Sequence, residues 1–151
     1  MATPLSIGIA GAGIGGLAAA AFLARESHRV TVFDQFEIAG PVGSGLILQE
    51  TGLTILHELG LRTEAEALGA PIRRLYGLSN PSGRIVLDVR YESLRPALMG
   101  VSIQRPALFN LVHGAALAAG ARLVPATRIT AANPNDATLV DSGGGVHGPF
   151  D

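Results

Sequence analysis

The chain has 151 residues, of which 48% are hydrophobic, and a formal net charge of −1. This length suffices for one ordinary domain with a buried core, and the balanced charge argues against a nucleic-acid partner or an anionic-membrane partner. Because the sequence contains no cysteine, disulfides, thiolate metal sites and cysteine nucleophiles are excluded. The four histidines are scattered without the spacing of a metal site.

An uncharged stretch at residues 6–24 first suggests a membrane helix or a secretory signal. A signal places its positive charge before the apolar core, whereas the first charge here is Arg25, after that core. Five glycines also fall within residues 8–16, and each glycine inside a helix costs about 0.5–1 kcal/mol relative to alanine. We therefore predict a cytoplasmic protein without a membrane partner.

The same stretch has the pattern of a β-α-β unit. Residues 5–10 form a short apolar run that predicts a strand buried on both faces, with parallel neighbours on both edges. Residues 14–25 predict a helix rich in alanine and leucine, and residues 29–33 predict a β-branched strand. A turn-rich segment follows at residues 39–45.

The middle of the chain predicts two helices and a hairpin. Leu53, Leu56 and Leu59 mark one face of a helix that ends at Gly60, and we interpret His57 on this helix as partly buried. The remaining elements are a short helix at 63–68, an antiparallel hairpin of residues 75–78 and 85–89 around a turn at 80–83, a helix from Pro106 to Gly120, and strands at 122–124, 128–131, 138–140 and 146–150.

The motif G-x-G-x-x-G occurs at residues 11–16, between a predicted strand and a predicted helix. Gly11 permits the tight turn, Gly13 lets the backbone approach a pyrophosphate, and Gly16 lets the helix pack closely on the strand. Asp34 ends the next strand, near the spacing of about 20 residues at which an acid binds the adenosine ribose hydroxyls and disfavours a 2′-phosphate. The alternative is an alanine- and glycine-rich helix hairpin with Asp34 as a solvated strand end.

Three segments together resemble the FAD-dependent aromatic hydroxylases, the single-component flavoprotein monooxygenases of the para-hydroxybenzoate hydroxylase and salicylate hydroxylase type. These segments are GIAGAGIGGLAAAAFLARESHRVTVFD, GSGLILQETGLTILHELGL and VSIQRPALFNLV. The resemblance implies an α/β, Rossmann-like FAD/NAD(P)-binding fold with a parallel sheet and an inserted antiparallel hairpin. It also implies FAD as the cofactor, NAD(P)H as the co-substrate, and hydroxylation of a small aromatic substrate with O2.

The resemblance also implies which residues hold the FAD. Adenosine would lie on Asp34 with Gln35 beside it, and Arg105 would contact the ribityl or phosphate region of the flavin. The loop 43–45, which ends at Gly45, would pass the flavin. The pyrophosphate would lie over the glycines of the motif, Gly11, Gly13, Gly15 and Gly16. No catalytic side chain and no metal ligand is expected, because the flavin supplies the chemistry.

Four positions depart from the pattern of the resembled family. Gln35 stands where many relatives carry an arginine near the adenine, and Val42 and Gly43 stand where some carry a phosphate-binding arginine. Ser27 replaces the glycine that ends the first helix, which costs up to about 1 kcal/mol if Ser27 adopts a left-handed conformation.

The resembled proteins are more than twice as long as this chain. We therefore expect an FAD-binding domain at 1–71 and 105–151, the first part of a substrate-domain sheet at 72–104, and a fold that is incomplete at the C-terminus and inactive by itself. The apolar edge of the first strand would then be covered by a homodimer, a domain swap or a complementing C-terminal polypeptide.

Other functions remain open at this stage. A flavin halogenase or a prenyl reductase would share the same N-terminal architecture, and the motifs that distinguish them would lie after residue 151. An NAD-dependent dehydrogenase would continue with repeated βα units, which the hairpin at 75–89 interrupts. A non-catalytic nucleotide-binding or interaction module is the third alternative.

Overall fold

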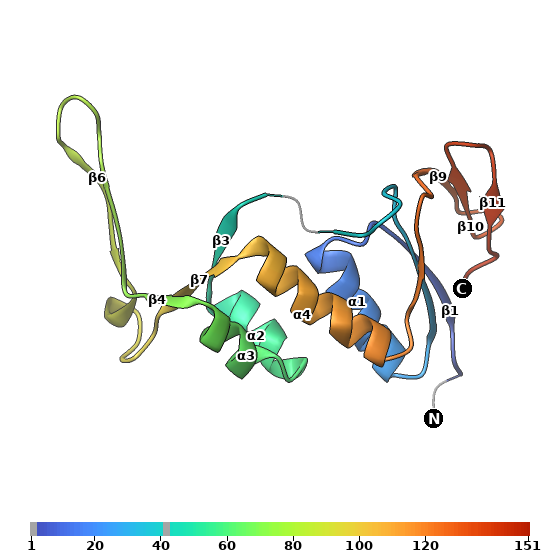
Figure 1. Ribbon diagram of the computed structural model, residues 1–151, viewed down its shortest axis with the longest axis horizontal. Helices are drawn as coiled ribbons and strands as arrows, with labels where there is room; N and C mark the ends of the chain where they lie inside the picture. The colour runs from blue at the N-terminus through green and yellow to red at the C-terminus, as the bar shows by residue number, and fades with distance from the viewer. Residues whose placement is uncertain (1–2, 41–42) are drawn as a thin grey trace. The chain divides into compact units, whose positions relative to one another are not determined.

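The computed structural model describes residues 3–40 and 43–151 of the chain (Figure 1). The chain divides into two compact units, of which the first is Met1–Val42 with Leu108–Asp151 and the second is Gly43–Ala107. The first unit contains the parallel sheet, and the second contains the hairpin. The predicted combination of a parallel sheet with an antiparallel hairpin is confirmed.

A three-stranded parallel sheet forms the core of the first unit. Its strands lie in the order β1-β2-β8 and are β1 (Ser6–Ala10), β2 (Arg29–Phe33) and β8 (Arg122–Val124). Helix α1 (Ile14–Arg25) packs against β1 and β2, so the predicted β-α-β unit is confirmed with its helix boundaries. The inner strand β2 buries Val30, Val32 and Phe33.

Strand β1 lies at an edge of this sheet. Among the described residues it pairs only with β2, although the main-chain N–H of Asp151 donates to the carbonyl oxygen of Ser6 at 2.9 Å. The expectation of parallel neighbours on both edges is therefore met on one edge within the part of the chain that the structure describes. That a second polypeptide covers the other edge stays a prediction.

A second sheet in the first unit is antiparallel, with the order β11-β10-β9. Its strands are β9 (Ile129–Asn133), β10 (Thr138–Asp141) and β11 (Val146–His147). The sequence predicted the last strand to reach Phe150, but it ends at His147. Gly148 adopts a φ of +125° and Pro149 has no N–H to donate, so the ladder cannot continue through them.

The second unit combines two helices with a small antiparallel sheet. Its helices are α2 (Glu50–Glu58) and α3 (Arg62–Leu68), and the sheet has the order β3-β7-β4, with β3 (Gly45–Leu48), β4 (Ala70–Ile72) and β7 (Gly100–Gln104). These three strands were not predicted, because each is short and is defined by pairing with residues far away in the sequence. Leu53, Leu56 and Leu59 are buried as expected, whereas His57 is exposed, which corrects its interpretation as partly buried.

The predicted hairpin is β5 (Arg74–Leu78) and β6 (Ile85–Arg90), which pair antiparallel (Figure 1). Every residue of β6 is exposed, including Ile85, Val86 and Leu87. A short 3₁₀ turn η1 (Tyr91–Ser93) follows, and Tyr91 is buried. An isolated two-stranded hairpin buries little apolar surface, so its own contacts stabilise it only weakly.

Helix α4 (Arg105–Ala118) begins one residue before the predicted Pro106. Its buried residues are Leu108, Phe109, Val112 and Ala116, which recur at helical spacing. The boundary between the two units falls in its first turn, after Ala107. His113 on this helix is half-buried and stacks on Phe109, with the ring centroids 5.5 Å apart.

Three helices end in the same backbone motif, with a left-handed residue after the last turn. Gly60 follows α2 with a φ of +73°, Gly120 follows α4 with a φ of +96°, and Ser27 follows α1 with a φ of +69°. After α1, the N–H of Ser27 donates to Ala24 and the N–H of His28 donates to Leu23. Serine therefore occupies a position that favours glycine, as the sequence predicted.

We expect the substitution Ser27→Gly to raise the free energy of unfolding by about 0.5–1 kcal/mol, because glycine has no Cβ to strain the left-handed conformation. Urea denaturation followed by circular dichroism measures the change. The matched control is Gly120→Ser, since a Cβ at Gly120 meets no atom within 4 Å and only the backbone conformation is strained. Gly120→Ser should lose a similar amount, and equal stability of Ser27→Gly and the unchanged protein would contradict the argument.

Candidate dinucleotide-binding site

The glycine motif forms a tight turn between β1 and α1, and this turn is hydrogen-bonded to the end of β2. Gly11 has a φ of +104°, and its N–H donates to the carbonyl oxygen of Phe33 at 2.7 Å. The N–H of Ala12 donates to Oδ2 of Asp34, also at 2.7 Å. The two strand ends that the sequence assigned to one site therefore lie within hydrogen-bond distance of each other.

Gly16 allows the helix to start directly above this turn. A Cβ at position 16 would overlap the carbonyl oxygen of Gly11, so any larger residue would force the helix away from the turn. Gly13 and Gly15 differ, because a Cβ at either would meet no atom within 4 Å. The motif thus contains one glycine that packing requires and two that leave open space at the start of the helix.

The N-terminus of α1 carries no side-chain cap. Its N-cap residue is Gly13, the first turn contains no acidic residue, and the helix has 12 residues. The first N–H groups of a helix have no intrahelical acceptor, and the helix dipole adds partial positive charge there. An anion such as a phosphate would satisfy these donors, which is the role that the sequence predicted for the motif.

Both oxygens of the Asp34 carboxylate accept main-chain hydrogen bonds. Oδ2 accepts from Ala12 and Oδ1 accepts from the N–H of Phe36 at 3.0 Å. These bonds hold the half-buried side chain in one orientation at the end of β2. Each carboxylate oxygen has a second lone pair, so the side chain can still accept hydrogen bonds from a pair of ribose hydroxyls.

A cavity of about 230 Å³ opens beside Asp34, at the carboxyl ends of the parallel strands. Ligands of open parallel sheets bind at this edge. The exposed side chain of Gln35 contributes to its wall. Sequence reasoning missed the far wall, because only the pairing of β8 with β2 brings the segment after β8 there. The lining residues are Ala10, Gly11, Phe33, Asp34, Gln35, Thr127, Arg128 and Ile129.

In the second unit, the structure brings together the loop 43–45 and Arg105. The N–H of Arg105 donates to the carbonyl oxygen of Ser44 at 3.0 Å, and a Cβ at Gly43 would lie 3.3 Å from Nε of Arg105. Gly43 has a φ of +101°, and Gly45 opens β3. The predicted flavin loop and the predicted flavin arginine are therefore neighbours, whereas Val42 lies outside the described residues.

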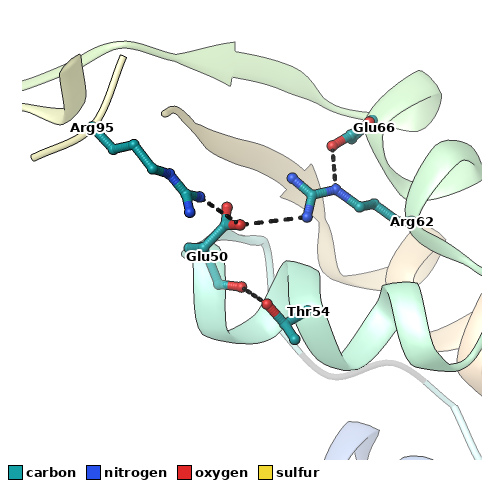
Figure 2. Close-up of polar contacts among 5 residues, drawn as sticks. All are labelled: Glu50, Thr54, Arg62, Glu66 and Arg95. Atoms are coloured by element: carbon teal, nitrogen blue, oxygen red, sulfur yellow. Dashed lines mark hydrogen bonds and ion pairs between the residues drawn. The ribbon is translucent and has the colours of Figure 1, made fainter. Parts of the chain in front are cut away.

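A cluster of ion pairs, which sequence reasoning did not find, joins both helices of the second unit to the segment before β7 (Figure 2). One oxygen of Glu50 accepts from Arg95 at 3.1 Å and lies 3.5 Å from Arg62. Glu66 accepts from Nε of Arg62 at 2.9 Å, and this hydrogen bond is the main cause that raises the pKa of Arg62. Because these charges satisfy one another at a partly exposed position, we assign the cluster a modest structural role.

A second polar pair links β10 to β11. Nε2 of His147 lies 2.7 Å from Oδ2 of Asp141, and the other oxygen of this carboxylate accepts from the N–H groups of Gly143 and Gly145. The hydrogen bond with His147, followed by the two glycine N–H groups, lowers the pKa of Asp141. One carboxylate thus organises the whole turn between the two strands.

Residues 3–40 and 43–151 contain neither a metal site nor a membrane-spanning helix. Within these residues, no group of three or more histidine, cysteine or acidic side chains is arranged to hold a metal ion. Likewise, none of the helices formed by these residues has the length and apolar character needed to cross a membrane.

A sequence profile of NAD(P)-binding Rossmann-like domains matches residues 9–68. Hispidin-3-hydroxylase of Neonothopanus nambi is 43% identical over 60 residues, which are 40% of this chain and 14% of that protein. Across the curated relatives that match, the chain spans between 14% and 24% of their length. These relatives are named as hydroxylases and monooxygenases.

Two solved structures contain the same fold as this chain. The tetrameric form of 2-methyl-3-hydroxypyridine-5-carboxylic acid oxygenase superposes with a TM-score of 0.82 at 20% identity, covering 97% of this chain and 38% of that one. PqsL of Pseudomonas aeruginosa, described as a probable FAD-dependent monooxygenase, has a TM-score of 0.74 at 23% identity, covering 95% and 40%.

The fold and the turn at residues 11–16 are those of a Rossmann-like domain. The resemblance to aromatic hydroxylases and flavoprotein monooxygenases that the sequence indicated is confirmed: the chain is similar to the N-terminal part of these proteins.

Alanine substitutions at Gly15, which is open, and at Gly16, which is packed, should change the free energy of unfolding in opposite directions. We expect Gly16→Ala to lower the free energy of unfolding by about 1–3 kcal/mol, because its Cβ overlaps the backbone of Gly11. Gly15→Ala should raise it by about 0.5–1 kcal/mol, because the site is open and alanine is the better helix former. Chemical denaturation of the pair measures both, and equal effects would refute this packing of α1.

The carboxylate of Asp141 should make stability depend on pH in the acid range. Its pKa in the folded protein lies below the ordinary value of 3.8, so its contribution is complete above that value and is lost as the pH falls through the folded pKa. Asp141→Asn should therefore lose less stability than the unchanged protein between about pH 6 and about pH 3, as measured by urea midpoints. Glu37→Gln is the control for removing one exposed carboxylate, and identical pH profiles for all three proteins would contradict the assignment.

Proposed function

We propose that the chain is the FAD-binding portion of a flavoprotein monooxygenase that hydroxylates an aromatic substrate with NAD(P)H and O2. The observation that carries the proposal is the hydrogen bond from Ala12 to Asp34, which joins the glycine turn to the acidic end of the next strand. This arrangement is the one that binds the pyrophosphate and adenosine ribose of a dinucleotide.

The residues of the candidate site fit the adenosine diphosphate part of an FAD molecule. The uncapped N-terminus of α1 and the open space at Gly13 and Gly15 suit the pyrophosphate, and Asp34 with Gln35 suits the adenosine. Arg105 and the loop 43–45 would contact the flavin side of the cofactor. When bound, the isoalloxazine supplies the redox and oxygen chemistry, and the protein binds and orients the cofactor and excludes water around it.

The names of similar proteins support the aromatic substrate. One acts by name on hispidin and another on a hydroxypyridine carboxylic acid. The chain spans 38% and 40% of the two solved chains described above. We therefore propose hydroxylation only for this chain in combination with the additional polypeptide that those proteins contain. For the 151-residue chain alone, we propose cofactor binding without turnover.

The direct test is the visible absorption spectrum of the purified chain after incubation with FAD and removal of free ligand by desalting. We expect the flavin to stay with the protein and to show its oxidised spectrum. We expect Asp34→Asn to weaken FAD binding, because it removes the negative charge of the carboxylate that accepts hydrogen bonds from the ribose hydroxyls. Incubation with NAD in parallel distinguishes the cofactors.

Circular dichroism of Asp34→Asn provides the control, because this side chain also holds the turn at Ala12. A folded variant with reduced flavin retention supports the proposal. Retention of NAD alone would favour a dehydrogenase, and retention of neither ligand would contradict cofactor binding by this chain and favour the non-catalytic alternative. A halogenase or a reductase would also retain FAD and differs in the product that the complete enzyme forms.

A further inference from the structure

The far wall of the cavity beside Asp34 contains an arginine whose side chain pairs with no other residue of the described fold. Arg128 lines this cavity and is exposed, and its guanidinium has no hydrogen-bond or ion-pair partner among residues 3–40 and 43–151. This absence contrasts with Arg62, Arg74 and Arg95, which all pair with carboxylates.

The backbone around Arg128 is held firmly to the strand that carries Asp34. The N–H of Asp34 donates to Val124, the N–H of Thr127 donates to the carbonyl oxygen of Asp34 at 2.7 Å, and the N–H of Ala126 donates to Phe36 at 2.9 Å. The carbonyl oxygen of Arg128 accepts from Ser142 at 2.8 Å. Both walls of the cavity are therefore fixed with respect to each other by main-chain hydrogen bonds, whereas no hydrogen bond among residues 3–40 and 43–151 holds the side chain of Arg128.

The turn that directs Arg128 to the cavity is strained. Ala126 has a φ of +51°, which an alanine adopts at an energetic cost and keeps only where surrounding bonds enforce it. The two main-chain bonds to the segment 34–36 enforce it here. Local strain of this kind is typical of ligand sites, and it adds an observation that is independent of the cavity itself.

Arg128 and Asp34 have opposite charges and share the cavity without meeting, since no ion pair within 4.0 Å joins them. A ligand that fits between them must offer hydroxyls to the carboxylate and a flat or electron-rich surface to the guanidinium. A phosphate near Asp34 would be repelled by the carboxylate, whereas the uncharged adenine ring would not. A planar guanidinium stacks favourably on an aromatic face.

We propose that Arg128 is a cofactor-binding residue that stacks on the adenine ring of a dinucleotide whose ribose is held by Asp34. This inference rests on the proposed dinucleotide site. It assigns a ligand contact to the far wall of that site, which the sequence did not predict. Arg128 then contributes to binding of the adenine ring, and Asp34 supplies the selectivity against a 2′-phosphate.

The test measures ADP binding to the intact 151-residue chain by isothermal titration calorimetry. We expect Arg128→Ala to weaken ADP binding about two- to fivefold, which is the effect of losing one exposed cation–π contact. Arg128→Lys should recover little of this loss, because an ammonium keeps the charge but not the flat stacking surface. Because residue 128 is exposed, both variants should fold, and thermal unfolding checks this.

Arg29→Ala is the matched control, because it removes the same charge at the other end of the strand that precedes Asp34. We expect this control to bind ADP like the unchanged protein. Adenosine 2′,5′-bisphosphate is the second probe, and it should bind more weakly than ADP to the unchanged chain because its 2′-phosphate approaches Asp34.

The outcomes distinguish a failure of the stacking role of Arg128 from a failure of the proposed dinucleotide site. If Asp34→Asn weakens ADP binding and Arg128→Ala does not, the stacking role is refuted while the dinucleotide site stands. If Arg128→Lys binds like the unchanged protein and the 2′-phosphate tightens binding, Arg128 binds a phosphate and the proposal is overturned. If the unchanged chain binds neither probe, the proposed function fails and this inference fails with it.

Discussion

The hydrogen bond from the main-chain N–H of Ala12 to the carboxylate of Asp34 is the contact on which the rest of the site depends. It joins the turn after β1 to the end of β2, and the carboxylate reaches Phe36 with its other oxygen. The start of α1 and the wall of the cavity are therefore positioned by one side chain. Because the same carboxylate faces the cavity, the group that organises the turn is also the group that can bind a ribose.

Close approach of backbone to backbone is the second constraint. The overlap that a Cβ at Gly16 would cause with Gly11 means that α1 starts as near to the turn as main-chain atoms permit. The uncapped N–H groups of the helix are thereby brought to the same edge of the sheet as the cavity. A helix that began farther away would have the same donors but would not direct them at this edge.

Several charged side chains serve the fold, whereas Arg128 lies at the wall of a cavity. Glu50, Arg62 and Arg95 satisfy one another, and Asp141 is used by His147 and the turn beside it. Arg128 has no such partner in the described part of the chain and faces a cavity. In a chain whose net charge is close to zero, an unpaired arginine at the wall of a cavity is more informative about binding than the total charge.

Local pattern was sufficient for the elements whose signals lie within a few neighbouring residues. The boundaries of α1 and β2, the glycine turn, the acid at Asp34 and the hairpin all follow from residue types at short spacing. The strands β3, β4 and β7 did not, because each is three to five residues long and exists only through its pairing with a distant strand. The far wall of the cavity was missed for the same reason: Arg128 lines the same cavity as Asp34 only because β8 pairs with β2, and a non-local pairing leaves no periodic signal in the sequence.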